Sequence, residues 1–97
     1  MQVQVIIGNA APGKNNKLQE IQAELASQGI EVPIIAGAAY TTPFFLNQIS
    51  SLAIAGGKHF LADDCTHFQI KAALNLAAQE EKSGLLYDLV VHLVRQA

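Results

Sequence analysis

The sequence predicts a small α/β domain: a three-layer open sheet of about three parallel strands with four helices, in the order β-α-β-α-β-α-α. Two observations carry this prediction. Short β-branched runs alternate with stretches whose apolar residues recur at helical spacing, and glycines separate the two kinds of segment. The 97 residues are the length of one domain, so we assign 1–97 to a single unit.

Three strands are expected, over residues 2–8, 30–36 and 58–62. The first is rich in valine and isoleucine and runs into a Gly-Asn turn. Pro33 lies inside the second and predicts either an edge position or a late strand start, because proline cannot donate to a ladder. Strands that alternate with helices pair in parallel through right-handed crossovers. Their carboxyl ends should therefore meet at one edge of the sheet.

The first two helices have clear limits. An amphipathic pattern starts at Asn16 and stops at Gly29, a position typical of a left-handed C-terminal residue. The second helix is expected over 43–55. Thr42 would be its N-cap and Pro43 its first residue, where the missing N–H costs nothing.

The last two helices are predicted from a capping box and from a stripe of apolar residues. Thr66 and Gln69 form the capping-box pattern that opens the third helix, and Ser83-Gly84 ends it. Paired apolar residues recur at helical spacing over 85–97 and predict a fourth helix. His92 would then be a surface or interface residue of that helix.

Composition predicts self-association. Hydrophobic residues make up 51% of the chain and charged residues 14%, against about 25% charged in a typical protein. A small domain with so few charges would expose apolar surface, and such patches mark interfaces. We expect a homodimer or larger oligomer whose interface includes part of 85–97 or 43–55. The alternative is a monomer whose surface is rich in alanine.

Charge and hydropathy exclude several partners. The net charge is −2 and no basic run occurs, which argues against a nucleic acid polymer. No window approaches the ~18 apolar residues that predict a membrane span. Cys65 is the single cysteine, so no internal disulfide can form, and the N-terminal residues do not resemble a signal peptide. We expect a cytoplasmic protein.

Unusual polar residues gather in the three loops that follow the predicted strands. Ligands of open parallel sheets bind at that carboxyl edge, so these loops are the expected ligand site. Asparagine, threonine and aspartate are also good turn and cap residues, which is the alternative reading. The candidate ligand-binding residues are Asn9, Gly13, Lys14, Tyr40, Thr41, Thr42, Asp63 and Asp64.

The first loop, Gly8 to Asn15, resembles a Walker A phosphate loop in its Gly-x-x-x-x-Gly-Lys spacing. It departs from that motif at two positions. Asn15 replaces the hydroxyl that holds magnesium, and Pro12 removes one of the amides that cradle phosphates. These departures argue against an ATPase. They leave either a generic anion site at a helix N-terminus with Lys14 nearby, or a plain Pro-Gly turn with a solvated lysine.

Cys65 and His67 are the candidate catalytic residues. A cysteine at a helix N-terminus can have a lowered pKa, and His67 could act as its base. Asp63 and Asp64 oppose that effect, and a lone cysteine is often a small buried hydrophobe. A metal site that adds His59 to these residues has no familiar zinc spacing, so we assign no metal ligand.

The leading hypothesis is a small oligomeric binding module for an anionic or nucleotide-like ligand at the carboxyl edge, with Lys14 supplying positive potential. Binding is expected rather than catalysis, and no cofactor is identified. The first alternative is a structural or protein-interaction module that acts through apolar helix surfaces. The second is a cysteine-based enzyme or carrier that uses Cys65 and His67.

Overall fold

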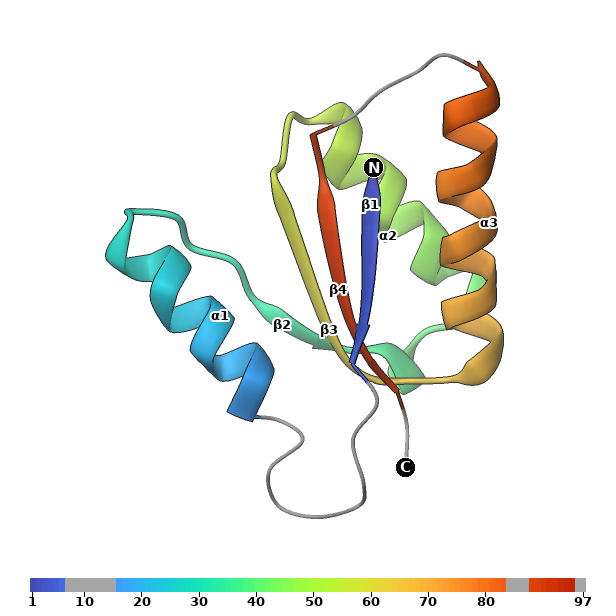
Figure 1. The fold of residues 1–97 in the computed structure, drawn as a ribbon. Coiled ribbons are helices and arrows are strands. Elements are labelled where there is room, and N and C mark those ends of the chain that lie inside the picture. The colour runs from blue at the N-terminus through green and yellow to red at the C-terminus, as the bar shows by residue number, and fades with distance from the viewer. Residues whose placement is uncertain (7–15, 84–87, 96–97) are drawn as a thin grey trace.

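Four parallel strands form the centre of the molecule, in the order β1-β4-β3-β2. The computed structural model describes residues 1–6, 16–83 and 88–95 (Figure 1). Its helices and strands are β1 Gln2–Ile6, α1 Asn16–Ser27, β2 Ile34–Ala36, the 3₁₀ helix η1 Gly37–Ala39, α2 Thr42–Ile54, β3 His59–Cys65, α3 His67–Ser83 and β4 Val90–Arg95.

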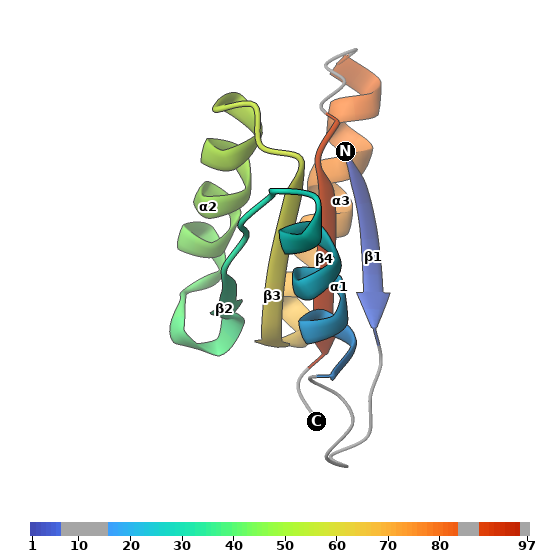
Figure 2. The same cartoon turned by 90° about the vertical axis from the view of Figure 1, so that its left-hand side faces the viewer.

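Helices cover both faces of this sheet. The chain moves from β1 across to β2 and then returns through β3 to β4, so right-handed crossovers place α1 on one face and α2 and α3 on the other. Figures 1 and 2 show this arrangement, with α1 alone on its side. The predicted α/β class and parallel sheet are confirmed. No described helix is long and apolar enough to cross a membrane.

The fourth predicted helix is wrong, because Val90–Arg95 is a strand at the centre of the sheet. Strand β4 pairs with β1 on one side and β3 on the other, and Val91, Leu93 and Val94 are fully buried. A strand covered by helices on both faces is apolar at consecutive positions, so it shows no alternation. The described part of the C-terminal segment therefore has a central place in the core.

His92 was expected at a surface or interface, and the structure corrects this too. Its side chain lies on the central strand β4 and is only 6% exposed. Alternate residues of a strand point to the same face, so His92 shares the α1 face with Val94. The correction follows directly from the change of β4 from helix to strand.

The second strand is shorter than predicted and begins at Ile34, immediately after Pro33. It lies at an edge of the sheet, as the proline indicates. The predicted first strand, 2–8, is confirmed over Gln2–Ile6, and its last two residues lie outside the described residues.

Local signals mark the helix ends well. Gly29 and Gly56 have φ values of 82° and 86°, the left-handed conformation that glycine favours. The N–H after each glycine donates to a helix carbonyl, that of Leu25 at 2.9 Å and that of Leu52 at 2.8 Å. These are Schellman motifs, so the positions where α1 and α2 end are explained by the sequence.

The limits of α2 and β3 differ from the prediction. Thr41, not Thr42, is the N-cap of α2, and its hydroxyl accepts from the N–H of Phe44 at 3.4 Å. Strand β3 continues to Cys65, past the predicted end at residue 62. Its longer course places Cys65 in the sheet and not at a helix N-terminus.

Candidate functional site

The loops that follow β2 and β3 lie at the same edge of the sheet, as the parallel arrangement predicts (Figure 1). After β2 and η1 come Tyr40, Thr41 and Thr42. Near the carboxyl end of β3 lie Asp63 and Asp64. The first predicted loop, with Asn9, Gly13 and Lys14, lies outside the described residues. The described part of the carboxyl edge therefore consists of these two loops and the strand ends beside them.

Gln69 holds the two loops together. Its Oε1 accepts from the Thr66 N–H at 2.9 Å, and its own N–H donates to the Thr66 hydroxyl at 3.2 Å, which confirms the capping box. Its Nε2 donates to the main-chain oxygens of Gly37 at 2.6 Å and Tyr40 at 2.9 Å. The side chain is 1% exposed, so these bonds form in a buried setting. The capping pattern found this residue, but its link to the preceding loop has no local sequence signal.

A β-bulge shapes the end of β3. The register with β4 shifts between Ala62 and Cys65, so that three residue steps on β3 match two on β4. Asp64 has φ of 54°, a left-handed conformation that aspartate tolerates better than most residues, and its N–H donates to Asp63 Oδ1 at 2.7 Å. Bulges re-aim side chains and are frequent beside functional sites. Both carboxylates therefore owe their placement to this irregularity.

Asp63 lines a hollow of about 190 Å³ at this edge, together with Leu18 and Gln19 of α1 and Ile34 of β2. Leu18 is buried against Leu61 and Val94, which fixes the start of α1 on the sheet. Of the predicted ligand-binding residues that the structure describes, Asp63 is the one that this lining includes.

The residues after β2 have mixed surroundings. The Tyr40 ring stacks on Phe44, with centroids 5.6 Å apart and planes 10° apart. The hydroxyl of Thr41 is engaged as the N-cap, whereas Thr42 is half-buried in the first turn of α2. Tyr40 is thus half-buried and packed against Phe44 and the larger core cluster, while the main role of Thr41 is to start the helix.

Cys65 and His67, the predicted catalytic residues, have different surroundings in the described structure. Cys65 is fully buried, and its Sγ donates to the Ala62 carbonyl at 3.5 Å. The pKa of the thiol is raised from 9.0 to about 12, chiefly by burial and also by the charges of Asp63 and Asp64, while a main-chain hydrogen bond with Val94 acts to lower it. His67 is exposed and meets Phe68 edge to face. Burial and the raised pKa both disfavour the thiolate, which is the nucleophilic form of cysteine.

The other half of the α1 face carries two histidines that sequence reasoning did not connect. His59 Nδ1 lies 3.5 Å from His92 Nε2, and the ring planes differ by only 19°. The centroids are 5.7 Å apart, which requires the two nitrogens to lie between the rings, so the rings meet edge to edge. His92 Nδ1 is buried without a hydrogen-bond partner among the described residues.

This setting disfavours a charge on His92. Burial, and then the neighbouring His59, lower the pKa of His92 below 6.5. Among the described residues, no group of three or more histidine, cysteine or acidic side chains is placed to hold a metal ion. His59 and His92 therefore form a contact between two imidazoles on the α1 face of the sheet, with a charge disfavoured on His92.

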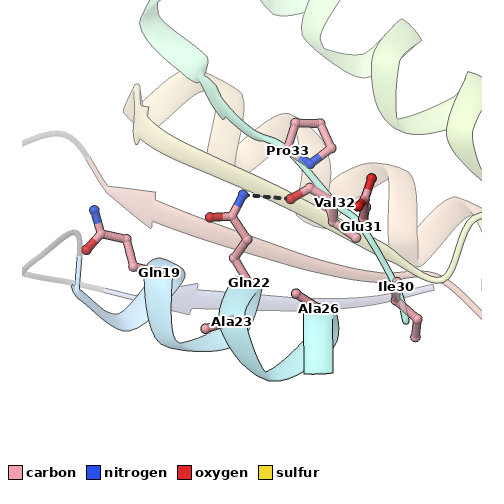
Figure 3. Close-up of a pocket in the computed structure, with 8 residues that line it drawn as sticks. All are labelled: Gln19, Gln22, Ala23, Ala26, Ile30, Glu31, Val32 and Pro33. Atoms are coloured by element: carbon pink, nitrogen blue, oxygen red, sulfur yellow. Dashed lines mark hydrogen bonds between the residues drawn. The ribbon is translucent and has the colours of Figure 1, made fainter. Parts of the chain in front are cut away.

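An open groove of about 570 Å³ lies between α1 and residues 30–33, on the way into β2 (Figure 3). Gln19, Gln22 and the small side chains of Ala23 and Ala26 form the helix side of it. Gln22 Nε2 reaches across and donates to the Val32 carbonyl at 2.8 Å. The groove shows that residues 30–33 stand away from the helix, with one side-chain hydrogen bond between them.

Comparison with protein family models, curated proteins and solved structures finds no match for this chain. The argument for function therefore rests on the geometry above.

Proposed function

We propose that the protein binds a small, hydroxyl-bearing anionic ligand, of nucleotide or sugar-phosphate type, at the carboxyl edge of its sheet. The observation that supports this proposal most is the position of Asp63, which a β-bulge brings into the hollow beside the start of α1. Crevices at the carboxyl ends of parallel strands are the usual ligand sites of this fold class. An acidic residue there commonly accepts hydrogen bonds from sugar hydroxyls.

The charge distribution supports a ligand with a hydroxyl-bearing part and a separate anionic part. Asp63 and Asp64 would repel a phosphate, so the described hollow suits the hydroxyl-bearing part of a ligand. Asp63 Oδ1 is engaged by the Asp64 N–H, which leaves Oδ2 as an acceptor within the described part of the chain. The sequence places Lys14 in the loop after β1, where a positive charge would serve the anionic part.

The test is a thermal-shift and calorimetric series with AMP, ADP and ribose 5-phosphate. A ligand that binds the native state must raise the melting temperature. We expect Asp63→Asn to weaken binding about tenfold, the loss of roughly one charge-assisted hydrogen bond. Asp88→Asn is the matched control, because Asp88 is exposed just before the amino end of β4. The proposal fails if none of the compounds binds, or if both variants bind alike.

A second candidate function is self-association through the helices of the α2 and α3 face. Four large apolar side chains of these helices are exposed. The exposed fraction is 52% for Phe44, 75% for Ile54, 72% for Phe68 and 46% for Leu74. The proposed interface is therefore on α2, with α3, and not on the segment that forms the buried strand β4. In sedimentation equilibrium, wild type should form dimers or larger species and Ile54→Glu should shift toward monomer. A wild-type species at 10.4 kDa would contradict it.

A further inference from the structure

The sheet contains a slit between β2 and β3. Strand β2 pairs with β3 only where Ile34–Ala36 meets Leu61–Asp63. Before that point residues 30–33 diverge from the first half of β3, as Figure 1 shows. A cavity of about 330 Å³ fills the gap. Its walls are mainly apolar and include Ile30, Val32, Leu52, Phe60 and Leu61.

The main chain of His59 faces this slit. The carbonyl of Lys58 accepts from the Val90 N–H at 2.8 Å, so it points toward β4. Main-chain groups of successive strand residues point to opposite sides. The N–H and C=O of His59 therefore point away from β4, into the slit.

Pro33 explains why the ladder stops there. Extending the register of β2 backward would pair the His59 carbonyl with the N–H of residue 33 and the His59 N–H with the carbonyl of Glu31. Proline has no N–H, so the first of these bonds cannot form. One donor and one acceptor of the half-buried His59 are therefore directed at a mainly apolar cavity, where main-chain groups normally have partners.

We infer that this slit binds a small, neutral, apolar molecule that carries an amide group. Its amide N–H and C=O would pair with the C=O and N–H of His59, as one residue of an added strand does. The cavity lies within the usual size range of small-molecule sites, which are mostly apolar with a few polar groups. Lys58 at the rim is paired with Asp88 at 3.2 Å, and the other charged lining residue is the acidic Glu31, so a neutral ligand is favoured over a carboxylate.

The site is separate from that of the proposed function. It lies toward the amino ends of the strands, and none of its lining residues lines the hollow of Asp63. The two proposals can therefore fail independently, and Asp63→Asn should leave binding in the slit unchanged.

The first experiment titrates ¹⁵N-labelled protein with N-acetyl-phenylalaninamide and follows the amide resonances by NMR. We expect saturable shifts at His59 and its neighbours in β3, with the largest at the His59 N–H. The analogue with every amide nitrogen methylated, which retains the apolar body but has no donor, should bind at least about tenfold more weakly. The absence of saturable shifts, or equal binding of the analogue, would overturn the inference.

The second experiment fills the slit from α2. Gln48 lines the cavity, whereas its neighbour Asn47 is exposed. We expect Gln48→Trp to lose at least about tenfold in affinity for the same probe, and Asn47→Trp to stay within about twofold. Circular dichroism establishes that both variants fold. Unchanged binding by folded Gln48→Trp would show that the probe binds elsewhere.

Discussion

The two faces of the sheet are built differently. The face under α2 and α3 is apolar throughout, and Phe45 and Ile49 of α2 are fully buried against it. The face under α1 has a small apolar cluster of Leu18, Leu61 and Val94 near the carboxyl edge. Beyond that cluster the same face carries a buried histidine pair, and the open groove lies beside α1. The α2 and α3 face therefore contains the larger apolar core, whereas the α1 face has space for polar side chains and a groove.

The connection of the strands explains this difference. Two crossovers return from β2 to β4 and place two helices on one face, while a single crossover serves the other. Helix α1 diverges from the sheet, and the chain that follows it rejoins β3 only at Ile34. A face covered by one helix leaves strand surface for polar side chains and cavities.

The largest effect should come from opening the apolar face. Phe45→Ala is expected to cost about 3–5 kcal/mol, because it leaves a cavity in the larger core cluster. Leu18→Ala should cost less, about 2–3 kcal/mol, since the cluster around it is smaller and nearer to an open hollow. Urea denaturation measures both. Equal losses would contradict the proposed division between the two faces.

Next in size is the polar link at the end of the apolar face. Gln69→Leu should lower the free energy of unfolding by about 2–3 kcal/mol, because it leaves the carbonyls of Gly37 and Tyr40 without their donor. Gln79→Leu on the exposed side of α3 is the matched control and should change stability by less than about 0.5 kcal/mol. If the two variants were equally stable, the hydrogen bonds of Gln69 would not contribute to the stability of the fold.

The third prediction concerns the stability of the protein at acidic pH and tests the role of the α1 face. The folded pKa of His92 lies below its unfolded value of 6.5, so the unfolded state takes up more protons as the pH falls. The stability contribution of neutral His92 is present above pH 6.5 and is lost as the pH falls from there toward the folded pKa. Denaturation at pH 7.5 and pH 5.0 should show this loss in wild type.

Two variants sharpen that measurement. His92→Phe removes the group that resists protonation and should reduce the loss between the two pH values. His67→Gln, at an exposed position, should leave it unchanged. If His92→Phe retained the full acid sensitivity, the buried pair would not be its source.

The smallest effect is expected at the slit. Pro33→Ala restores an N–H that can donate to the His59 carbonyl, which should stabilise the native state by about 1 kcal/mol. The substitution also increases the conformational entropy of the unfolded chain, which should lower stability by a similar amount. Net stability should change by less than about 1 kcal/mol. Hydrogen exchange is the sharper measurement, because the new amide should be protected if β2 lengthens. Pro43→Ala in the first turn of α2 is the control for the change in unfolded-state entropy. If the amide of residue 33 were unprotected in Pro33→Ala, the slit would stay open without the proline.

Features governed by neighbouring residues could be predicted from the sequence. The glycine stops, the capping box of Thr66 and Gln69, and the late start of β2 at Pro33 depend on the chain within a few positions. The parallel α/β class follows from their order. These signals need no knowledge of which strands become neighbours.

The rest depends on that knowledge. Residues 89–94 are apolar at every position except His92, and such a run does not distinguish a buried helix from a strand covered on both faces. Only the sheet order makes it the central strand. Likewise, the contact of His59 with His92 and the bonds from Gln69 to the η1 turn join residues about thirty positions apart. At the candidate site, the bulge that places Asp63 arises from pairing with β4 and has no signal in β3 alone.

The central position of β4 also bears on how the chain acquires its structure during synthesis. Gln2 pairs with Val90, so β1 has no neighbour in the sheet until residues 90–95 emerge from the ribosome. Until then β1 has no partner strand, and β3 lacks one of its two partners. Contacts between such distant residues form slowly, because a long loop must close first. The nascent chain should therefore have unpaired strand edges throughout the synthesis of residues 2–95, the condition in which chaperones protect a chain from aggregation.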